Sequence, residues 1–296
     1  MVERKGRALI AWRCAQFFKN GDFVNLGIGL PLMCVNYLPE GVDLWLEAEI
    51  GTVGSGPSPD WDHVDIDVID AGGQPASVIT GGSVYDHETS FAFIRGGHID
   101  ATVLGTLQVD QEGNIANWTI PGKFAPGMGG AMDLCAGVKK IIVATDHCEK
   151  SGHSKILKKC TLPLTGAHCV TDIVTERCYF EVTPQGLVLR ELAPGYTVED
   201  IRACTEADFI VPETIARHGR MKGRAGPLRT TNHEPLKRRC RETAPFSLFL
   251  IIAVGLLSGR LLGLLFGFFF GRRFFGRRRF FLRFFPVVAA DAVTGR

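Results

Sequence analysis

The chain has 296 residues and a formal net charge of +2, with 33 basic and 31 acidic side chains. Residues 1–216 hold 16 basic and 28 acidic side chains (net −12), whereas residues 217–296 hold 17 basic and 3 acidic ones (net +14). The acidic part is long enough for one sizeable hydrophobic core, and we expect no nucleic-acid partner.

Nine cysteines are spread along the chain without any C-x-x-C pair. Because their number is odd and their spacing shows no pairs, we expect free thiols in a reducing compartment rather than a disulfide framework. We expect no metal site, because the histidines near these cysteines repeat no ligand spacing. The N-terminus shows neither the apolar segment of a secretory signal nor the composition of an organellar one, so we expect a cytoplasmic protein.

Apolar periodicity predicts alternating helices and strands over residues 1–216. The expected helices cover 3–19, 31–37, 87–94 and 198–205. The expected strands cover 23–26, 44–47, 64–69, 76–79, 101–107, 140–145, 172–175, 178–182 and 187–191, and a terminal strand follows at 207–212. This alternation is typical of an α/β domain with a largely buried sheet, in which ligands lie beyond the carboxyl ends of the strands.

The segment LEAEIGTVGSGP at 46–57 places two carboxylates between an apolar strand and a turn of glycines and small residues. Period-two alternation puts Glu47 and Glu49 on one face of the strand and Ala48 on the other. A carboxylate at such a strand end is typical of covalent chemistry, and one of the two is then the nucleophile. The alternative is a solvated strand end without chemistry.

Two glycine-rich turns are expected at the same edge of the sheet. Gly27-Ile28-Gly29 lacks the third glycine of a dinucleotide-binding motif, so we interpret it as a tight strand-to-helix turn whose N–H groups face a ligand. The segment PGMGGAMD at 126–133 is either a flexible loop or an oxyanion hole, because amides of glycines can approach a developing negative charge closely.

Several ordered motifs span residues 4–213. They are VNLGIGLP at 24–31, the Glu49 loop ending in GSGP at 54–57, SFAFIRGGH at 90–98, ANWTIPGK at 116–123, GMGGAMDL at 127–134 and KCTLPLTG at 159–166. With these motifs the chain resembles the B (β) subunit of two-subunit 3-oxoacid coenzyme A transferases of the succinyl-CoA/acetate/acetoacetate type. The resemblance implies an α/β fold, with a single CoA-transferase-like domain at 1–213 built on a mixed, mostly buried sheet flanked by helices.

The resemblance also implies the chemistry. The family's nucleophile is the glutamate of a Ser-Glu-Asn-Gly motif, which corresponds to Glu49 here, and the oxyanion amides correspond to Gly130 and Ala131. Asn25 corresponds to an asparagine that contacts substrate or CoA. We expect the glycines of these turns to contribute to substrate or CoA binding as well, namely Gly27, Gly29, Gly51 and Gly129.

In such an enzyme CoA passes from a short-chain acyl-CoA to a carboxylic acid through a glutamyl-CoA thioester. The resemblance implies no metal and no cofactor, since coenzyme A is a substrate. It also implies that this chain matches one half of a fused enzyme, so the expected partner is an A subunit, in a heterotetramer.

The chain departs from the family pattern near the expected nucleophile. The sequence Ala48-Glu49-Ile50-Gly51 lacks both polar neighbours of the glutamate, and Gly73 stands where the family often has a CoA-contacting lysine. Glu47 adds a second negative charge, which raises the pKa of one of the two carboxyl groups. A second hypothesis is therefore a non-catalytic binding or regulatory subunit of the same fold.

Residues 214–296 match nothing in that family. Their longest uncharged run, 243–259, has 17 residues, which is short for a membrane span, and Arg260 follows it. Three interpretations stay open: an irregular or disordered tail, a marginal membrane helix, or a frameshift-like extension beyond the true stop. The membrane interpretation supplies a third hypothesis, a protein tethered to a membrane by its tail.

Overall fold

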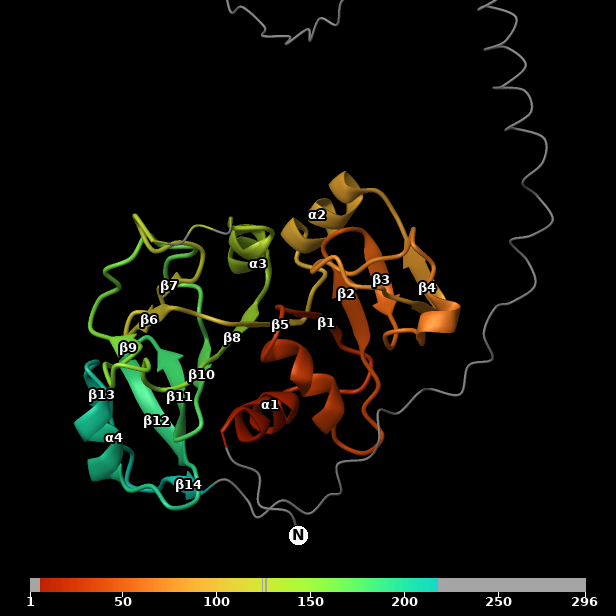
Figure 1. Cartoon of the computed structure of the whole chain (residues 1–296). Helices are drawn as coiled ribbons and strands as arrows, with labels where there is room; N and C mark the ends of the chain where they lie inside the picture. The colour runs from red at the N-terminus through yellow and green to blue at the C-terminus, as the bar shows by residue number, and fades with distance from the viewer. Residues whose placement is uncertain (1–5, 124, 126, 218–296) are drawn as a thin grey trace, which may run out of the picture. The chain divides into compact units, whose positions relative to one another are not determined.

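The structure is a computed structural model that describes residues 6–123, 125 and 127–217 (Figure 1). The predictions for the C-terminal tail lie outside the described residues, and the domain boundary at residue 213 stays a prediction. The last described strand, β14 (Ala216–Arg217), pairs with β12.

The main sheet has eleven strands among the described residues and runs in the order β13-β12-β11-β10-β8-β5-β1-β2-β3-β4, with β14 beside β12. Its other strands are β1 (Phe23–Leu26), β2 (Trp45–Ala48), β3 (Thr52–Ser55), β4 (Val78–Val84), β5 (Ala101–Leu104), β8 (Lys140–Ala144), β10 (Asp172–Val174), β11 (Cys178–Thr183), β12 (Gly186–Leu192) and β13 (Phe209–Ile210). A smaller sheet has the order β7-β6-β9, formed by β6 (Gln108–Asp110), β7 (Ile115–Ala116) and β9 (Ile156–Leu157).

The α-helices are α1 (Arg7–Ala15), α2 (His87–Arg95), α3 (Ala131–Gly137) and α4 (Val198–Cys204), and the 3₁₀ helices are η1 (Pro31–Tyr37) and η2 (Trp61–His63). In Figure 1, α2 and α3 lie side by side at one end of the strands, and α1 covers another part of the sheet. The predicted fold class, a mixed α/β sheet flanked by helices, is confirmed for these residues.

The central strands are buried on both faces of the sheet. Strands β2, β1, β5, β8 and β10 run parallel in this order. In β8, Ile141 and Val143 join one hydrophobic cluster, whereas Ile142 and Ala144 join the other, which includes residues of α1. Because successive side chains point to opposite faces, a continuous apolar run is the expected signature of such a doubly covered strand.

Several predicted boundaries are confirmed and others are wrong. Strand 23–26 matches β1, and 31–37 matches η1, although its turns are 3₁₀ rather than α-helical. The first helix ends at Ala15 and not at residue 19, because residues 16–18 continue as turns. β3 and α3 were not predicted, and α3 begins directly after the glycine-rich turn at 127–130.

The strand predicted at 64–69 is wrong. This segment forms turns, with a single isolated bridge from Ile69 to Pro75. Asp65 accepts a hydrogen bond from the N–H of Asp67, and Asp70 accepts two from the backbone that follows it. Such local bonds to aspartate compete with strand pairing, which overrides the alternating apolar pattern.

The described cysteines are all free thiols, and Cys135 and Cys169 form a hydrogen-bonded pair. Among the residues that the structure describes, no three His, Cys, Asp or Glu side chains lie close enough together to hold a metal ion. A search of the described residues finds no helix with the length and hydropathy to cross a membrane.

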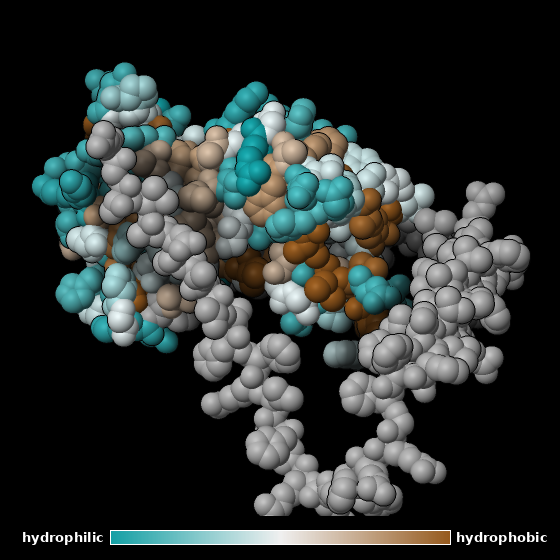
Figure 2. All heavy atoms as spheres, turned by 90° about the horizontal axis from the view of Figure 1, so that it is seen from above, coloured by the Kyte–Doolittle hydropathy of each residue, from teal (hydrophilic) through white to brown (hydrophobic). Residues whose placement is uncertain are grey.

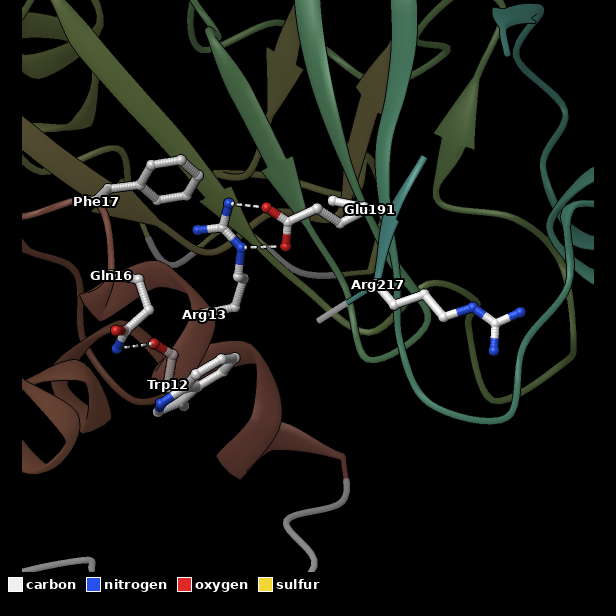
Figure 3. Close-up of a pocket in the computed structure, with 7 residues that line it drawn as sticks. Trp12, Arg13, Gln16, Phe17, Glu191 and Arg217 are labelled. Atoms are coloured by element: carbon white, nitrogen blue, oxygen red, sulfur yellow. Dashed lines mark hydrogen bonds and ion pairs between the residues drawn. The ribbon is translucent and has the colours of Figure 1, made fainter. Parts of the chain in front are cut away.

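A buried ion pair joins α1 to β12 (Figure 3). The guanidinium of Arg13 donates to both carboxylate oxygens of Glu191, at 2.7 and 2.6 Å, and lies 4.2 Å from the ring centre of Phe17. The side chains of Arg13 and Glu191 are only 10% and 20% exposed. Removing one partner of such a pair leaves the other charged and poorly solvated.

We therefore expect Arg13→Ala to lower the free energy of unfolding by about 3 kcal/mol. Arg7→Ala is the matched control on the same helix, because the Arg7 side chain is 67% exposed and its loss should change stability by less than about 0.5 kcal/mol. Urea unfolding followed by circular dichroism measures both variants. Equal effects of the two substitutions would contradict the structural role of the Arg13 pair.

Candidate active site

Glu49 lies in a tight turn at the carboxyl end of β2. The turn closes with a hydrogen bond from the Gly51 N–H to the Ala48 carbonyl at 2.9 Å, and the Tyr85 N–H donates to the Gly51 carbonyl at 2.9 Å. Gly51 has φ of +120°, and a Cβ there would collide with the Tyr85 carbonyl oxygen. The turn therefore requires glycine at this position. The N–H of Gly51 closes the turn and its carbonyl accepts from Tyr85, so the predicted contact of Gly51 with substrate or CoA stays a prediction.

The carboxylate of Glu49 meets the predicted oxyanion turn. The Gly130 N–H donates to Glu49 Oε1 at 3.2 Å, across 81 positions of sequence. A Cβ added to Gly130 would lie 2.5 Å from Glu49 Oε2, and one added to Gly129 would lie 3.3 Å from Oε1. The structure thus brings the predicted residues Glu49, Gly129 and Gly130 together, and the missing side chains make the close approach possible.

The other predicted site residues lie in different surroundings. The N–H of Ala131 donates to the Met128 carbonyl at 3.3 Å, and the N–H of Gly27 donates to the Val103 carbonyl at 2.9 Å. Both amides therefore serve local structure. Gly29 is exposed, with φ of +85°. The assigned roles of these residues stay predictions.

Asn25 is buried beside Glu47 on the neighbouring parallel strand. Its Nδ2 donates to Glu47 Oε2 at 2.8 Å, and its Oδ1 accepts a hydrogen bond from Thr102 Oγ1 at 3.3 Å. Ser90 Oγ of α2 donates to the other oxygen, Glu47 Oε1, at 3.1 Å. Asn25 therefore positions Glu47 in the free chain, and its predicted contact with substrate or CoA stays a prediction.

Glu47 and Glu49 differ in their electrostatics. Burial raises the pKa of Glu47 to about 7, and the negative charge of Glu49 adds to this rise, whereas the hydrogen bonds from Asn25 and Ser90 oppose it. The prediction that one carboxyl has a raised pKa is confirmed, but its main cause is burial rather than the neighbouring charge. β2 ends at Ala48, so the period-two argument for a shared face does not extend to Glu49.

Helix α2 supports the site, and this contribution was missed. The ring of Phe91 lies 3.3 Å from the position of a Cβ on Gly130, and His87 packs on Phe91 with ring centres 4.6 Å apart. Arg95 joins α2 to α3 through a 2.7 Å ion pair with Asp133. The motif at 90–98 signalled this region, but no role could be assigned to its side chains from sequence.

Comparisons with known proteins show the family of this chain. Residues 8–203 match the family model described as coenzyme A transferase. The chain belongs to the coenzyme A transferase family. An acetate CoA-transferase subunit beta of Haemophilus influenzae is 54% identical over 207 residues, which are 70% of this chain and 92% of the relative.

A longer relative aligns with this chain over part of its length. The mouse protein named succinyl-CoA:3-ketoacid coenzyme A transferase 2B, mitochondrial, is 47% identical over 211 residues, which cover 71% of this chain and 41% of that protein. The crystal structure of an acyl-CoA transferase apoenzyme from Escherichia coli O157:H7 has the same fold, with a TM-score of 0.57 and 22% identity over 73% of this chain and 44% of that one.

The close approach at Gly130 can be tested directly. Gly130→Ala places a methyl group against the Glu49 carboxylate, so we expect CoA transfer to fall by about 100-fold, the typical cost of displacing a reacting group by about 1 Å. Gly105→Ala is the matched control, because its Cβ would meet nothing within 4 Å and its φ is not positive. Unaltered transfer by Gly130→Ala would show that the Glu49 contact is not needed for turnover.

Proposed function

We propose that this chain is the B subunit of a two-subunit CoA transferase and that Glu49 carries the covalent intermediate. The observation that carries the proposal is the 3.2 Å hydrogen bond from the Gly130 amide to the Glu49 carboxylate. It joins a nucleophile to a donor that can stabilise the oxyanion formed beside it. Membership of the family supports the reaction class, transfer of CoA between an acyl-CoA and an acid.

The first half of the reaction loads CoA onto the chain. A carboxylate oxygen of Glu49 attacks the thioester carbonyl of an acyl-CoA, and cleavage of the carbon–sulfur bond leaves a mixed anhydride and a CoA thiolate. The thiolate attacks the Cδ atom of Glu49 and breaks its bond to the bridging oxygen. The original acid leaves as its carboxylate, and Glu49 becomes a glutamyl-CoA thioester.

The second half reverses these steps with a new acid. Its carboxylate attacks the Cδ atom of the thioester and releases the CoA thiolate, which then attacks the acyl carbonyl of the new anhydride. The new acyl-CoA leaves and the Glu49 carboxylate is restored. One negative charge is present throughout and no proton is transferred. Each tetrahedral intermediate needs an amide donor, and the hydrogen bond from the Gly130 amide to Glu49 supports this role for Gly130. The second predicted donor is Ala131, whose N–H donates to the Met128 carbonyl in the free chain.

We propose short-chain acyl-CoAs and carboxylic acids as substrates, since the names of the relatives refer to acetate, succinyl-CoA and 3-ketoacids. Coenzyme A is then a substrate and no further cofactor is required. The Haemophilus protein is named as a beta subunit, which supports an A-type partner for this chain, in an expected heterotetramer. A cytoplasmic location stays a prediction.

Exposed apolar side chains near the site support a partner subunit. Ile28 follows β1 and is 69% exposed, Val84 precedes Tyr85 and is 72% exposed, and Met132 of α3 is 54% exposed. Figure 2 shows that apolar residues gather on part of the face seen from above. Large exposed apolar side chains of this kind are typical of protein interfaces.

Trapping of the intermediate tests the role of Glu49. After incubation with an acyl-CoA, borohydride should reduce the glutamyl-CoA thioester to a primary alcohol, and peptide mass analysis should locate the change at Glu49. Glu49→Gln should abolish both the label and the exchange, because an amide is a far poorer nucleophile than a carboxylate. A label on Glu47 would refute the assignment. Binding of CoA without label or exchange would favour the non-catalytic subunit.

The partner is tested by expression with and without an A-type subunit. We expect the chain to be inactive by itself and to gain exchange activity when the two subunits are produced together, since the alignment with the mouse relative covers only 41% of that protein. Size-exclusion chromatography with light scattering measures the assembly. Full exchange by the isolated chain would contradict the two-subunit proposal.

A further inference from the structure

Glu47 is a buried carboxyl group directly beside the proposed reaction centre. It is 4% exposed, and it lies two residues before Glu49 at the end of β2. Two strands and one helix surround it, since Asn25 comes from β1, Val53 is its register partner on β3, and Ser90 comes from α2. The reaction described above assigns it no chemical step.

Its hydrogen bonds show where a proton can be held. The amide nitrogen of Asn25 can only donate, and the amide oxygen already accepts from Thr102, so Glu47 Oε2 must remain an acceptor. The hydroxyl of Ser90 can either donate or accept. A proton on Glu47 Oε1 can therefore be donated to Ser90 Oγ, and both contacts persist in either charge state.

The charges that face Glu47 favour its neutral form. Strands β1 and β3 contribute no titratable side chain, and α2 contributes His87, Glu88 and Arg95, all exposed. Within the described residues, the neighbouring charge that acts on Glu47 is that of Glu49, and no basic side chain offsets it. The hydroxyl of Tyr85 is buried and has no hydrogen-bond partner among the described residues. Burial raises the pKa of Tyr85 to about 12, and the charge of Glu47 adds to this rise.

The charge of Glu47 matters because every proposed step places a negative charge at Glu49. The incoming acid approaches as a carboxylate, and each tetrahedral intermediate is an oxyanion. An ionised Glu47 repels both, whereas a neutral Glu47 repels neither. Because the reaction moves no proton, Glu47 has no need to exchange one during turnover and acts through its charge alone.

We propose that Glu47 is a proton-linked positioning residue: neutral Glu47 lets an anionic acid react at Glu49, and ionised Glu47 suppresses the reaction. The inference rests on the proposed function. It predicts that transfer weakens as the pH rises through the titration of Glu47, near pH 7. It also makes the approach of the acid the step most sensitive to pH, so the KM for the acid should rise.

The test compares the full chain, assembled with an A-type subunit, with its variants Glu47→Gln, Ser90→Ala and Glu88→Gln. Between about pH 6 and pH 9, kcat/KM for acetate with acetoacetyl-CoA should fall about tenfold in the unaltered protein, the factor that corresponds to one pKa unit of charge interaction. Glu47→Gln, a neutral isostere, should abolish the fall. Ser90→Ala should move it to higher pH, because the Ser90 hydrogen bond holds the pKa of Glu47 down. Glu88→Gln, an exposed control on α2, should behave as the unaltered protein does.

A second measurement needs no turnover. Since the folded-state pKa of Glu47 is raised, the folded protein binds more protons than the unfolded chain between about pH 4.5 and pH 7, and stability is lost as the pH rises through this window. We therefore compare the urea midpoints of Glu47→Gln and the unaltered protein at pH 5 and pH 8. The midpoint of the variant minus that of the unaltered protein should be larger at pH 8 than at pH 5.

The outcomes separate this inference from the proposed function. If transfer occurs but Glu47→Gln keeps the same alkaline fall, or the two urea midpoints change in parallel, the inference is wrong and the proposed function stands. If no protein transfers CoA at any pH, the proposed function fails, and the role of Glu47 fails with it. An alkaline fall that disappears in Glu47→Gln, moves up in Ser90→Ala and is unchanged in Glu88→Gln supports the inference.

Discussion

The site depends on one close contact, in which the backbone of Gly130 approaches the carboxylate of Glu49 with no Cβ between them. An amide at 3.2 Å can stabilise negative charge that forms beside Glu49, but a methyl group on the same residue would occupy the position of the carboxylate. The contact joins two segments that are far apart in sequence. Much of the surrounding structure therefore serves to hold these two turns in place.

Helices α2 and α3 hold one side of this contact, and strand β2 holds the other. The ion pair from Arg95 to Asp133 joins the two helices, and Phe91 packs against the position of Gly130. On the strand side, Gly51 allows the chain to reverse immediately after Glu49. The helix groups Phe91, Arg95 and Asp133 lie on regular elements, an arrangement that holds a reacting group in place better than a loop does.

Glu47 and Glu49 show how similar carboxyl groups receive different properties from their surroundings. Glu47 is enclosed by two neighbouring strands and a helix, and this burial raises its pKa, whereas Glu49 lies half-buried in the turn beyond. Burial without a cation favours the neutral acid, because removing a carboxylate from water costs more than two neutral hydrogen bonds return. The same helix that supports the glycine turn, α2, also supplies the hydroxyl of Ser90 to Glu47. Changes in α2 therefore act on both carboxyl groups.

The sequence by itself determined the fold class and the bounds of β1 and η1, because apolar periodicity and glycine spacing are local properties. The residue pattern left Glu47 and Glu49 as alternatives, and the family resemblance selected Glu49 and the glycine turn at 127–130. It did not reveal β3, α3 or the turns at 64–69, where tertiary contacts and aspartate bonds to the backbone outweigh the pattern. Nor did it distinguish the roles of Glu47 and Asn25. Burial and hydrogen-bond partners decide whether a carboxyl group is charged and what an amide contacts, and both arise only when β1, β2 and α2 pack together.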